Sequence, residues 1–137
     1  MGAGIAKQFK EQYPGMFMRY RILCKQGVIT PGSVMFDDAE GRHIANVATK
    51  NHWQDPSQEQ WVSAGIRTLA DHFRSEDVSS AAMTMLGCGL GGLDPGDVFT
   101  MMLREFHELP TQVRVYVSPS DSGVQKMRSA YKKWMES

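Results

Sequence analysis

With 137 residues, the chain has a length typical of one domain with a single buried core. Fifteen basic and fifteen acidic residues cancel, so the net charge predicts neither the basic face of a general nucleic-acid binder nor a polybasic membrane surface. The sequence shows no signal-peptide pattern and no apolar run near the roughly 18 residues that span a bilayer, and its two cysteines are too few for a disulfide framework. We therefore expect a cytoplasmic protein with no membrane segment.

The first part of the chain predicts two helices followed by two strands. A short helix over Gly4–Tyr13 is interrupted by a Pro-Gly pair, and a second helix with apolar residues at spacings of four and three ends at Gly27. Ser33–Phe36 and His43–Thr49 have the composition of strands, separated by a polar hairpin at residues 37–41. These two strands form either an antiparallel hairpin or part of a parallel sheet.

A long helix and a third strand follow. Ser57 is expected to cap this helix, and one apolar stripe runs along it, formed by Val62, Ile66, Leu69 and Phe73. Such a stripe is typical of a helix that packs on a sheet. Ser80–Leu86 is a mostly apolar run of strand length, bounded by polar residues and glycines.

The last part of the chain predicts a helix, a strand and a helical tail. Asp94 and Pro95 have the residue types of an N-cap and a first helical position, and Val98, Met102 and Phe106 are expected to face inward. Val113–Val117 is predicted to be a strand, and the tail is helical from Ser120. Strands that alternate with helices indicate an α/β layered fold, whose crossovers favour parallel pairing.

A glycine-rich segment, Leu86 to Pro95 (LGCGLGGLDP), leaves the third strand and enters a helix. Glycines let a backbone approach a ligand closely, and a helix N-terminus adds positive potential, so the segment suits a diphosphate. The alternative is a tight turn without a ligand. The spacing of Gly87, Gly89 and Gly92 also matches a dinucleotide fingerprint, but that motif belongs to the first β-α unit and needs an acidic residue after the next strand, which ends in Val-Ser-Pro here.

Two further segments carry candidate chemistry. Residues 2–9 (GAGIAKQF) form a second glycine-led entry into a helix, which fits either another phosphate contact or a simple helix cap. Residues 46–53 (NVATKNHW) end a strand and deliver Lys50, His52 and Trp53 into a loop. A lysine can attack a masked carbonyl once its pKa is lowered. The alternative is a solvated lysine beside a packing tryptophan.

Together these segments resemble the macro domains, in the branch that contains terminal ADP-ribose glycohydrolases and the antitoxins that reverse DNA ADP-ribosylation. The resemblance extends from Met1 to about Val117 and rests on the order and spacing of MGAGIAKQF, YPGMFMRYRILCKQG, PGSVMF, IANVATKNHW, LGCGLGGLDPGDV and VRVYV. It implies a three-layer α/β/α fold with a mixed sheet and a cleft for ADP-ribose at the strand ends. We expect one domain over residues 1–137, with a family core at 1–117 and a helical extension at 118–137.

The resemblance also implies residue roles. Lys50 takes the position of the lysine that attacks the distal ribose, and His52 and Trp53 are possible neighbours of the leaving group. Tyr116 is expected near the adenine. The remaining candidate contacts with ADP-ribose come from the two glycine segments and the strand end: Gly2, Ala3, Gly4, Ile5, Thr49, Gly87, Cys88, Gly89, Leu90, Gly91 and Gly92. No metal and no separate cofactor is expected.

Two departures from the family pattern bear on function. Gly91 occupies the position of the aspartate that resolves the adduct in protein-directed members, which favours a nucleic-acid adduct over a glutamyl one. Family members also carry two strands before Met1, so the chain is expected to be N-terminally truncated. A longer parent chain, another copy or partner chain that fills the gap, or closure into a smaller sheet would each avoid unpaired backbone groups.

The expected activity is therefore that of an ADP-ribosyl glycohydrolase, an N- or O-glycosyl hydrolase that removes ADP-ribose from nucleic acid or protein with a lysine nucleophile. The expected partners are ADP-ribose or an ADP-ribosylated macromolecule, and a second copy or another chain at the missing strands. Two alternatives remain: a non-catalytic ADP-ribose reader or scavenger, and a phosphatase that acts on ADP-ribose 1″-phosphate.

Overall fold

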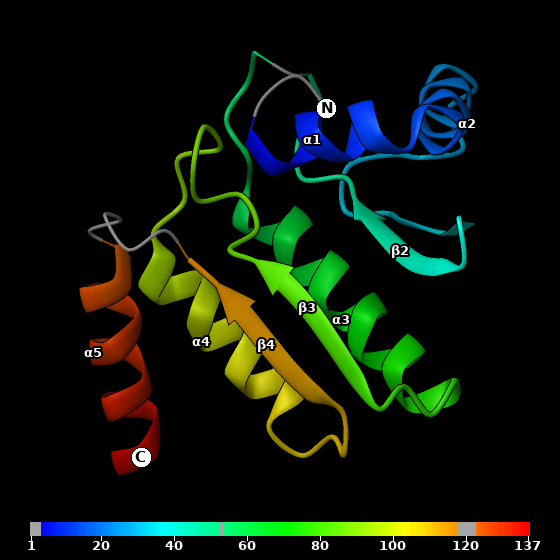
Figure 1. The fold of residues 1–137 in the computed structure, drawn as a ribbon. Helices are drawn as coiled ribbons and strands as arrows, with labels where there is room; N and C mark the ends of the chain where they lie inside the picture. Colours follow the sequence, from blue (N-terminus) through cyan, green and yellow to red (C-terminus); the bar gives the residue numbers. More distant parts are fainter. Residues whose placement is uncertain (1–3, 53, 118–122) are drawn as a thin grey trace.

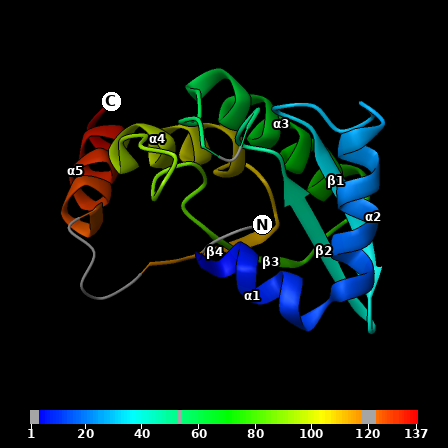
Figure 2. The ribbon, with the colours of Figure 1, turned by 90° about the horizontal axis from the view of Figure 1, so that it is seen from above.

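The computed structural model describes residues 4–52, 54–117 and 123–137 (Figure 1). The order of the elements is the predicted one, two helices, two strands and then alternating helices and strands: α1 (Gly4–Gln12), α2 (Pro14–Lys25), β1 (Val34–Ala39), β2 (Arg42–Val47), α3 (Glu59–Ser75), β3 (Ser80–Thr84), α4 (Pro95–Phe106), β4 (Gln112–Tyr116) and α5 (Gly123–Glu136). The view from above separates three layers, with α3 and α4 on one side of the strands and α1 on the other (Figure 2). The expected α/β/α layering is confirmed.

The main core lies between the strands and the pair α3–α4. The predicted stripe of α3 and the predicted inward residues of α4 are all buried, and the rings of Phe73 and Phe106 meet at 5.7 Å between centroids. Half-buried residues of both strand pairs pack against this cluster, including Val34, Val47 and Met83. A smaller cluster of Tyr13, Met16 and Ala39 joins the α1–α2 corner to β1. Spacing alone predicted the main core because each helix presents one apolar face.

The strands pair in both directions. β1 and β2 form the antiparallel hairpin that the sequence allowed, and β3 and β4 pair in parallel, as the crossover through α4 predicts. The hairpin is tighter than expected, because Glu40 and Gly41 both have positive φ angles, 52° and 77°. Two such residues make a two-residue turn that matches strand twist, so β1 continues through residues 37–39, which were predicted to be a loop.

The two pairs of strands do not join. Among the described residues, β1–β2 and β3–β4 form separate two-stranded sheets, and β2 does not pair with β3. A cavity of about 2490 Å³ separates them, lined by residues of both β2 and β3, with Leu69 and Phe73 of α3 also on its wall. Figure 2 shows the same separation, with α1 crossing on one side. The remaining strands therefore do not close into a smaller sheet, the third of the arrangements considered from the sequence.

Two helix starts differ in how they are capped. At α4, the Asp94 carboxylate accepts a hydrogen bond from the N–H of Gly96 at 3.1 Å, as predicted, and Pro95 is the first helical residue. At α3, the N-cap is Gln58, with no side-chain capping bond, so the predicted cap by Ser57 is wrong. The backbone of Ser57 is instead committed to the glycine-rich loop, where its N–H donates to the carbonyl of Gly91 at 3.0 Å.

Among the helices that the structure describes, none combines the length and the apolar character that a membrane span requires.

The cap of α4 provides a test of the fold. Asp94→Ala is expected to lower the free energy of unfolding by about 1 kcal/mol, because the first turn of α4 loses its side-chain acceptor. Asp94→Asn retains an acceptor oxygen and should stay close to the original protein. Urea titration of both variants measures the difference, and equal losses in the two would show that the cap contributes through charge alone.

Candidate functional site

One cavity wall brings the three candidate segments together. The cavity between the strand pairs is lined by Gly4 and Ile5 from the start of α1, by Thr49 and Lys50 after β2, and by the loop after β3, which contributes Gly87, Gly89, Leu90 and Gly91. These segments are far apart in sequence, and in the fold they meet at one end of the strands (Figure 1). Eight of the predicted site residues therefore share one space.

The glycine-rich loop, residues 86–93, is shaped by internal hydrogen bonds. Gly87 and Gly92 have φ angles of 73° and 79°, which favour glycine, and the N–H of Leu93 closes the loop on the carbonyl of Gly87 at 2.9 Å. The N–H of Gly92 bonds the carbonyl of Gly89 at 3.1 Å. Within the described structure, no group accepts a hydrogen bond from the N–H groups of Gly89, Leu90 or Gly91. Three successive donors are thus available for an anion.

Gly91 fixes the loop against the chain just before α3. A Cβ atom on Gly91 would lie 2.4 Å from the carbonyl oxygen of Gly87 and 2.4 Å from Oγ of Ser57, so no other residue fits without a shift. Gly91 is buried, whereas its neighbour Leu90 is 80% exposed at the tip of the loop. Gly89 differs from Gly91, because a Cβ at that position would meet nothing within 4 Å.

The start of α1 supplies a second group of donors. The helix begins at Gly4, whose φ of 60° lies in the left-handed region, and the N–H groups of a first helical turn have no partner within their helix. The positive end of the helix dipole adds to them. Gly2 and Ala3, the other predicted residues of this segment, lie outside the described residues. The described part of the segment and the glycine-rich loop thus offer backbone donors to the same cavity.

Lys50 follows β2, at a point where the backbone is fixed by hydrogen bonds. Just before it, Ala48 exchanges backbone hydrogen bonds with the turn that precedes β1, donating to Ser33 at 2.9 Å and accepting from Gly32 at 2.7 Å. Thr49 and Lys50 are both half-buried on the cavity wall. This end of β2 thus places Lys50 on the wall of the same cavity that the two groups of backbone donors line.

Several predicted residues do not line the cavity. His52 is exposed, and its Nδ1 accepts a hydrogen bond from the N–H of Gln54 at 3.4 Å. Cys88 is packed against the main core, Gly92 is exposed and donates its N–H to Gly89 within the loop, and Tyr116, at the end of β4, is 57% exposed. Trp53 lies outside the described residues. Roles for these residues stay predictions.

The structure adds cavity residues that the sequence did not indicate. Asn51 lies beside Lys50 on the wall, and Ser57 faces Gly91, with a buried Oγ that has no hydrogen-bond partner among the described residues. Tyr13, between α1 and α2, and Tyr20 of α2 also line the cavity. Burial, with a smaller contribution from the thiol of Cys24, raises the pKa of the Tyr20 hydroxyl above its usual range, so this group is neutral at physiological pH. No local pattern marks these residues, because tertiary packing alone brings them to the wall.

Comparisons with known proteins agree on one family. The family model described as Macro domain matches residues 1–102. A DNA ADP-ribosyl glycohydrolase of Mycobacterium tuberculosis is 40% identical over 124 residues, which cover 88% of this chain and 35% of that protein. The solved macrodomain of Mycobacterium tuberculosis DarG is 38% identical, with a TM-score of 0.81, over 86% of this chain and 81% of that one.

A second solved structure extends the comparison to a bound ligand. Thermosipho africanus DarTG in complex with ADP-ribose is 27% identical, with a TM-score of 0.73, over 91% of this chain and 37% of that chain. The chain spans about a third of the length of the curated DNA ADP-ribosyl glycohydrolases that it matches.

The two glycines of the loop give a matched test of its geometry. Gly91→Ala is expected to lower the free energy of unfolding by about 1–3 kcal/mol, since the new Cβ meets backbone that cannot move aside. Gly89→Ala places its Cβ in open space and should change stability by less than about 0.5 kcal/mol. Thermal and urea unfolding measure both variants. Equal destabilisation by the two would contradict the packing described for Gly91.

Proposed function

Because the chain belongs to the macro domain family, we propose that it binds ADP-ribose in the cavity between its strand pairs and hydrolyses an ADP-ribosyl bond there. One observation carries this proposal: the start of α1, the Lys50 segment and the glycine-rich loop all line the same space. The relatives named as DNA ADP-ribosyl glycohydrolases, and a solved relative that holds ADP-ribose, support the choice of ligand.

The backbone donors define where the diphosphate would lie. The free N–H groups of Gly89, Leu90 and Gly91 can bind phosphate oxygens on one side, and the first turn of α1 adds donors and positive potential on the other. Gly2, Ala3, Gly87, Cys88 and Gly92 are proposed to shape the same subsite. Thr49 lies next to Lys50 on the wall and is proposed to contact the distal ribose. Tyr116 is proposed near the adenine.

Lys50 is proposed as the nucleophile. Its Nζ, once unprotonated, attacks the anomeric carbon of the distal ribose, and the bond from that carbon to the modified base or carboxylate breaks. The leaving group takes the bonding electrons and a proton, and Lys50 is left joined to ADP-ribose. Water then attacks the same carbon, releasing ADP-ribose and returning the lysine. His52 and Trp53 are proposed on the side of the leaving group.

The glycine at position 91 bears on the substrate. Ser57 Oγ and the carbonyl of Gly87 fill the space that a side chain at this position would need, so no carboxylate can be accommodated there to resolve a protein adduct. Asp94, the nearby acid, caps α4 and lies 3.8 Å from the amine of Lys126. We therefore propose an ADP-ribosylated nucleic acid as the substrate, in keeping with the relatives that are named DNA ADP-ribosyl glycohydrolases.

The same observation supports a second candidate. A site without a resolving carboxylate would form the covalent adduct and release it slowly, or would bind ADP-ribose without turnover. The chain would then act as a reader or scavenger of ADP-ribose. Calorimetry separates the two functions, because a reader binds ADP-ribose yet releases no product from modified DNA during long incubation.

We also propose that added backbone fills the space between β2 and β3. Each of these strands pairs on one side only, and strand edges at the centre of a fold normally have partners on both sides. The apolar wall from Leu69 and Phe73 suits a strand with alternating apolar residues. About a fifth of the chain of the solved DarG macrodomain has no counterpart here, which is enough for such a strand. We propose that its source is an earlier part of a longer chain, another chain or a second copy.

The nucleophile is tested by Lys50→Ala. Release of ADP-ribose from a modified oligonucleotide is expected to fall by at least about a hundredfold, since the covalent step is lost, while ADP-ribose still binds. Lys132→Ala, an exposed lysine of α5, is the matched control and should keep the original rate. Product release followed by chromatography measures both. An unchanged rate in Lys50→Ala would refute the lysine mechanism.

The proposed strand between β2 and β3 is tested by adding peptides that could take its place. Synthetic peptides that span the part of the solved DarG macrodomain without a counterpart here are added to the full chain. A peptide that fills the space should raise the melting temperature, with a stabilisation of about 2.7 kcal/mol at a hundred times its dissociation constant. The control peptide carries proline at alternate positions and cannot pair. A stable dimer by light scattering would identify a second copy as the occupant. If no peptide raises the melting temperature and no dimer forms, the proposal is overturned.

A further inference from the structure

The zero net charge of the chain hides a strong segregation of charge. Residues 4–25, which form α1 and α2, contain five basic residues and one acidic residue. Residues 26–122 contain six basic and thirteen acidic residues, and α5 is again basic, with four basic residues and one acidic residue. A polyanion would therefore be attracted to α1, α2 and α5 and repelled by the acidic residues between them in the sequence.

The basic side chains of α1 and α2 are available to a partner. Lys7, Arg21 and Lys25 are exposed, and none of them forms an ion pair with any residue that the structure describes. Arg19 is the exception, because it binds Asp37 on β1 at 2.8 Å. The amine of Lys10 lies 4.5 Å from the centre of the Phe17 ring, which pairs a cation with an aromatic surface.

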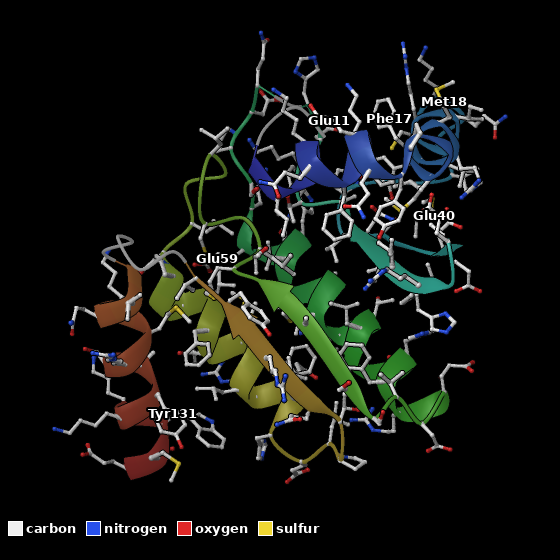
Figure 3. The ribbon with its side chains drawn as sticks, in the orientation of Figure 1. Glu11, Phe17, Met18, Glu40, Glu59 and Tyr131 are labelled. Carbon is white, nitrogen blue, oxygen red and sulfur yellow. The ribbon has the colours of Figure 1, made fainter. Side chains whose placement is uncertain are left out.

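The same helices offer apolar contact. Met18 and Ile22 are about half exposed and lie four residues apart, so they share one face of α2. Figure 3 shows Phe17 and Met18 on this helix, at the side of the molecule away from α5. Cations interleaved with exposed apolar and aromatic side chains are the combination that holds single-stranded nucleic acid through its phosphates and its bases.

The location of the cavity favours α1 and α2 over α5 as the surface that contacts a nucleic acid. Residues from both α1 and α2 line the cavity that holds Lys50 and the glycine-rich loop, whereas no residue of α5 does so among those described. Figures 1 and 2 place α5 on the opposite side of the molecule from α2. A strand that carries an adduct in the cavity would thus pass along α1 and α2.

We propose that α1 and α2 form the docking surface for the nucleic-acid strand that carries the ADP-ribosyl group, an inference that rests on the proposed function. Arg21 and Lys25 contact backbone phosphates, and the Phe17–Ile22 segment contacts bases beside the modified one. The surface adds affinity for a polymer substrate and none for an isolated modified nucleotide.

The test compares two double variants with the same loss of charge. Arg21→Ala/Lys25→Ala removes the proposed contacts, and Lys132→Ala/Lys133→Ala removes two exposed basic residues of α5. Binding of an unmodified single-stranded oligonucleotide to the full chain is followed by fluorescence anisotropy over a range of salt concentrations. The α2 variant should bind at least about fivefold more weakly, and the slope of log K against log salt should fall in magnitude by about 1.4, or 0.7 for each lost contact.

The α5 variant should retain both the affinity and the slope. Equal losses in the two variants would show that only the overall charge matters and would overturn the proposal, as would unchanged binding by the α2 variant. An acidic peptide of the same net charge serves as a competitor, and its binding with equal affinity would reassign the surface to an acidic protein.

Turnover separates this inference from the proposed function. With a modified oligonucleotide, kcat/KM of the α2 variant should fall at least about fivefold, and with a modified mononucleotide it should not change. If the original chain turns over neither substrate, the proposed hydrolase function fails, while the anisotropy result still decides whether the surface binds nucleic acid.

Discussion

The apolar stripe of α3 holds the two pairs of strands in one structure. Since β2 and β3 do not pair, their relative position depends on the side chains that both pairs pack against this helix and α4. Gly65 makes the close approach to β2 possible, because a Cβ there would lie 2.5 Å from Val47. At the other end, Gly87 and Gly91 pack against Val62 and Ser57. The lysine after β2 and the glycine-rich loop are thus positioned by one helix.

The sequence predicted most of what depends on local pattern. The order of elements, the stripe from Val62 to Phe73 and the cap by Asp94 follow from spacing and residue type, and the structure contains all of them. Ser57 had the right residue type for a cap, but the N-cap lies one residue later, at Gln58, and the Ser57 N–H donates to the carbonyl of Gly91, a contact across 34 residues that no local rule describes. The hairpin turn was misjudged because a glutamate, Glu40, adopts a positive φ that usually marks glycine.

In the candidate site, too, local pattern predicted some features, and tertiary packing determined the others. Motif order predicted that the two glycine segments and Lys50 would lie near one another, and they share a cavity wall. The motif alone did not predict which N–H groups lack an acceptor. In the described structure, the N–H groups of Gly92 and Leu93 donate to carbonyls within the loop, whereas those of Gly89, Leu90 and Gly91 do not. Nor could it place Tyr116 and Cys88, whose positions depend on how β4 and the core pack. The total charge was equally uninformative, since an average over the chain cannot show that α1 and α2 are basic and the middle acidic.

The open space between the strand pairs connects stability with function. The cavity wall includes the facing strands β2 and β3 as well as Lys50 and the glycine-rich loop, so the proposed strand and the proposed nucleotide would both contact the two sides of one space. When two partners stabilise one arrangement, each must increase the affinity of the other by the same factor. If both proposed partners stabilise the same spacing of the two strand pairs, the strand would increase the affinity for the nucleotide as well as complete the fold.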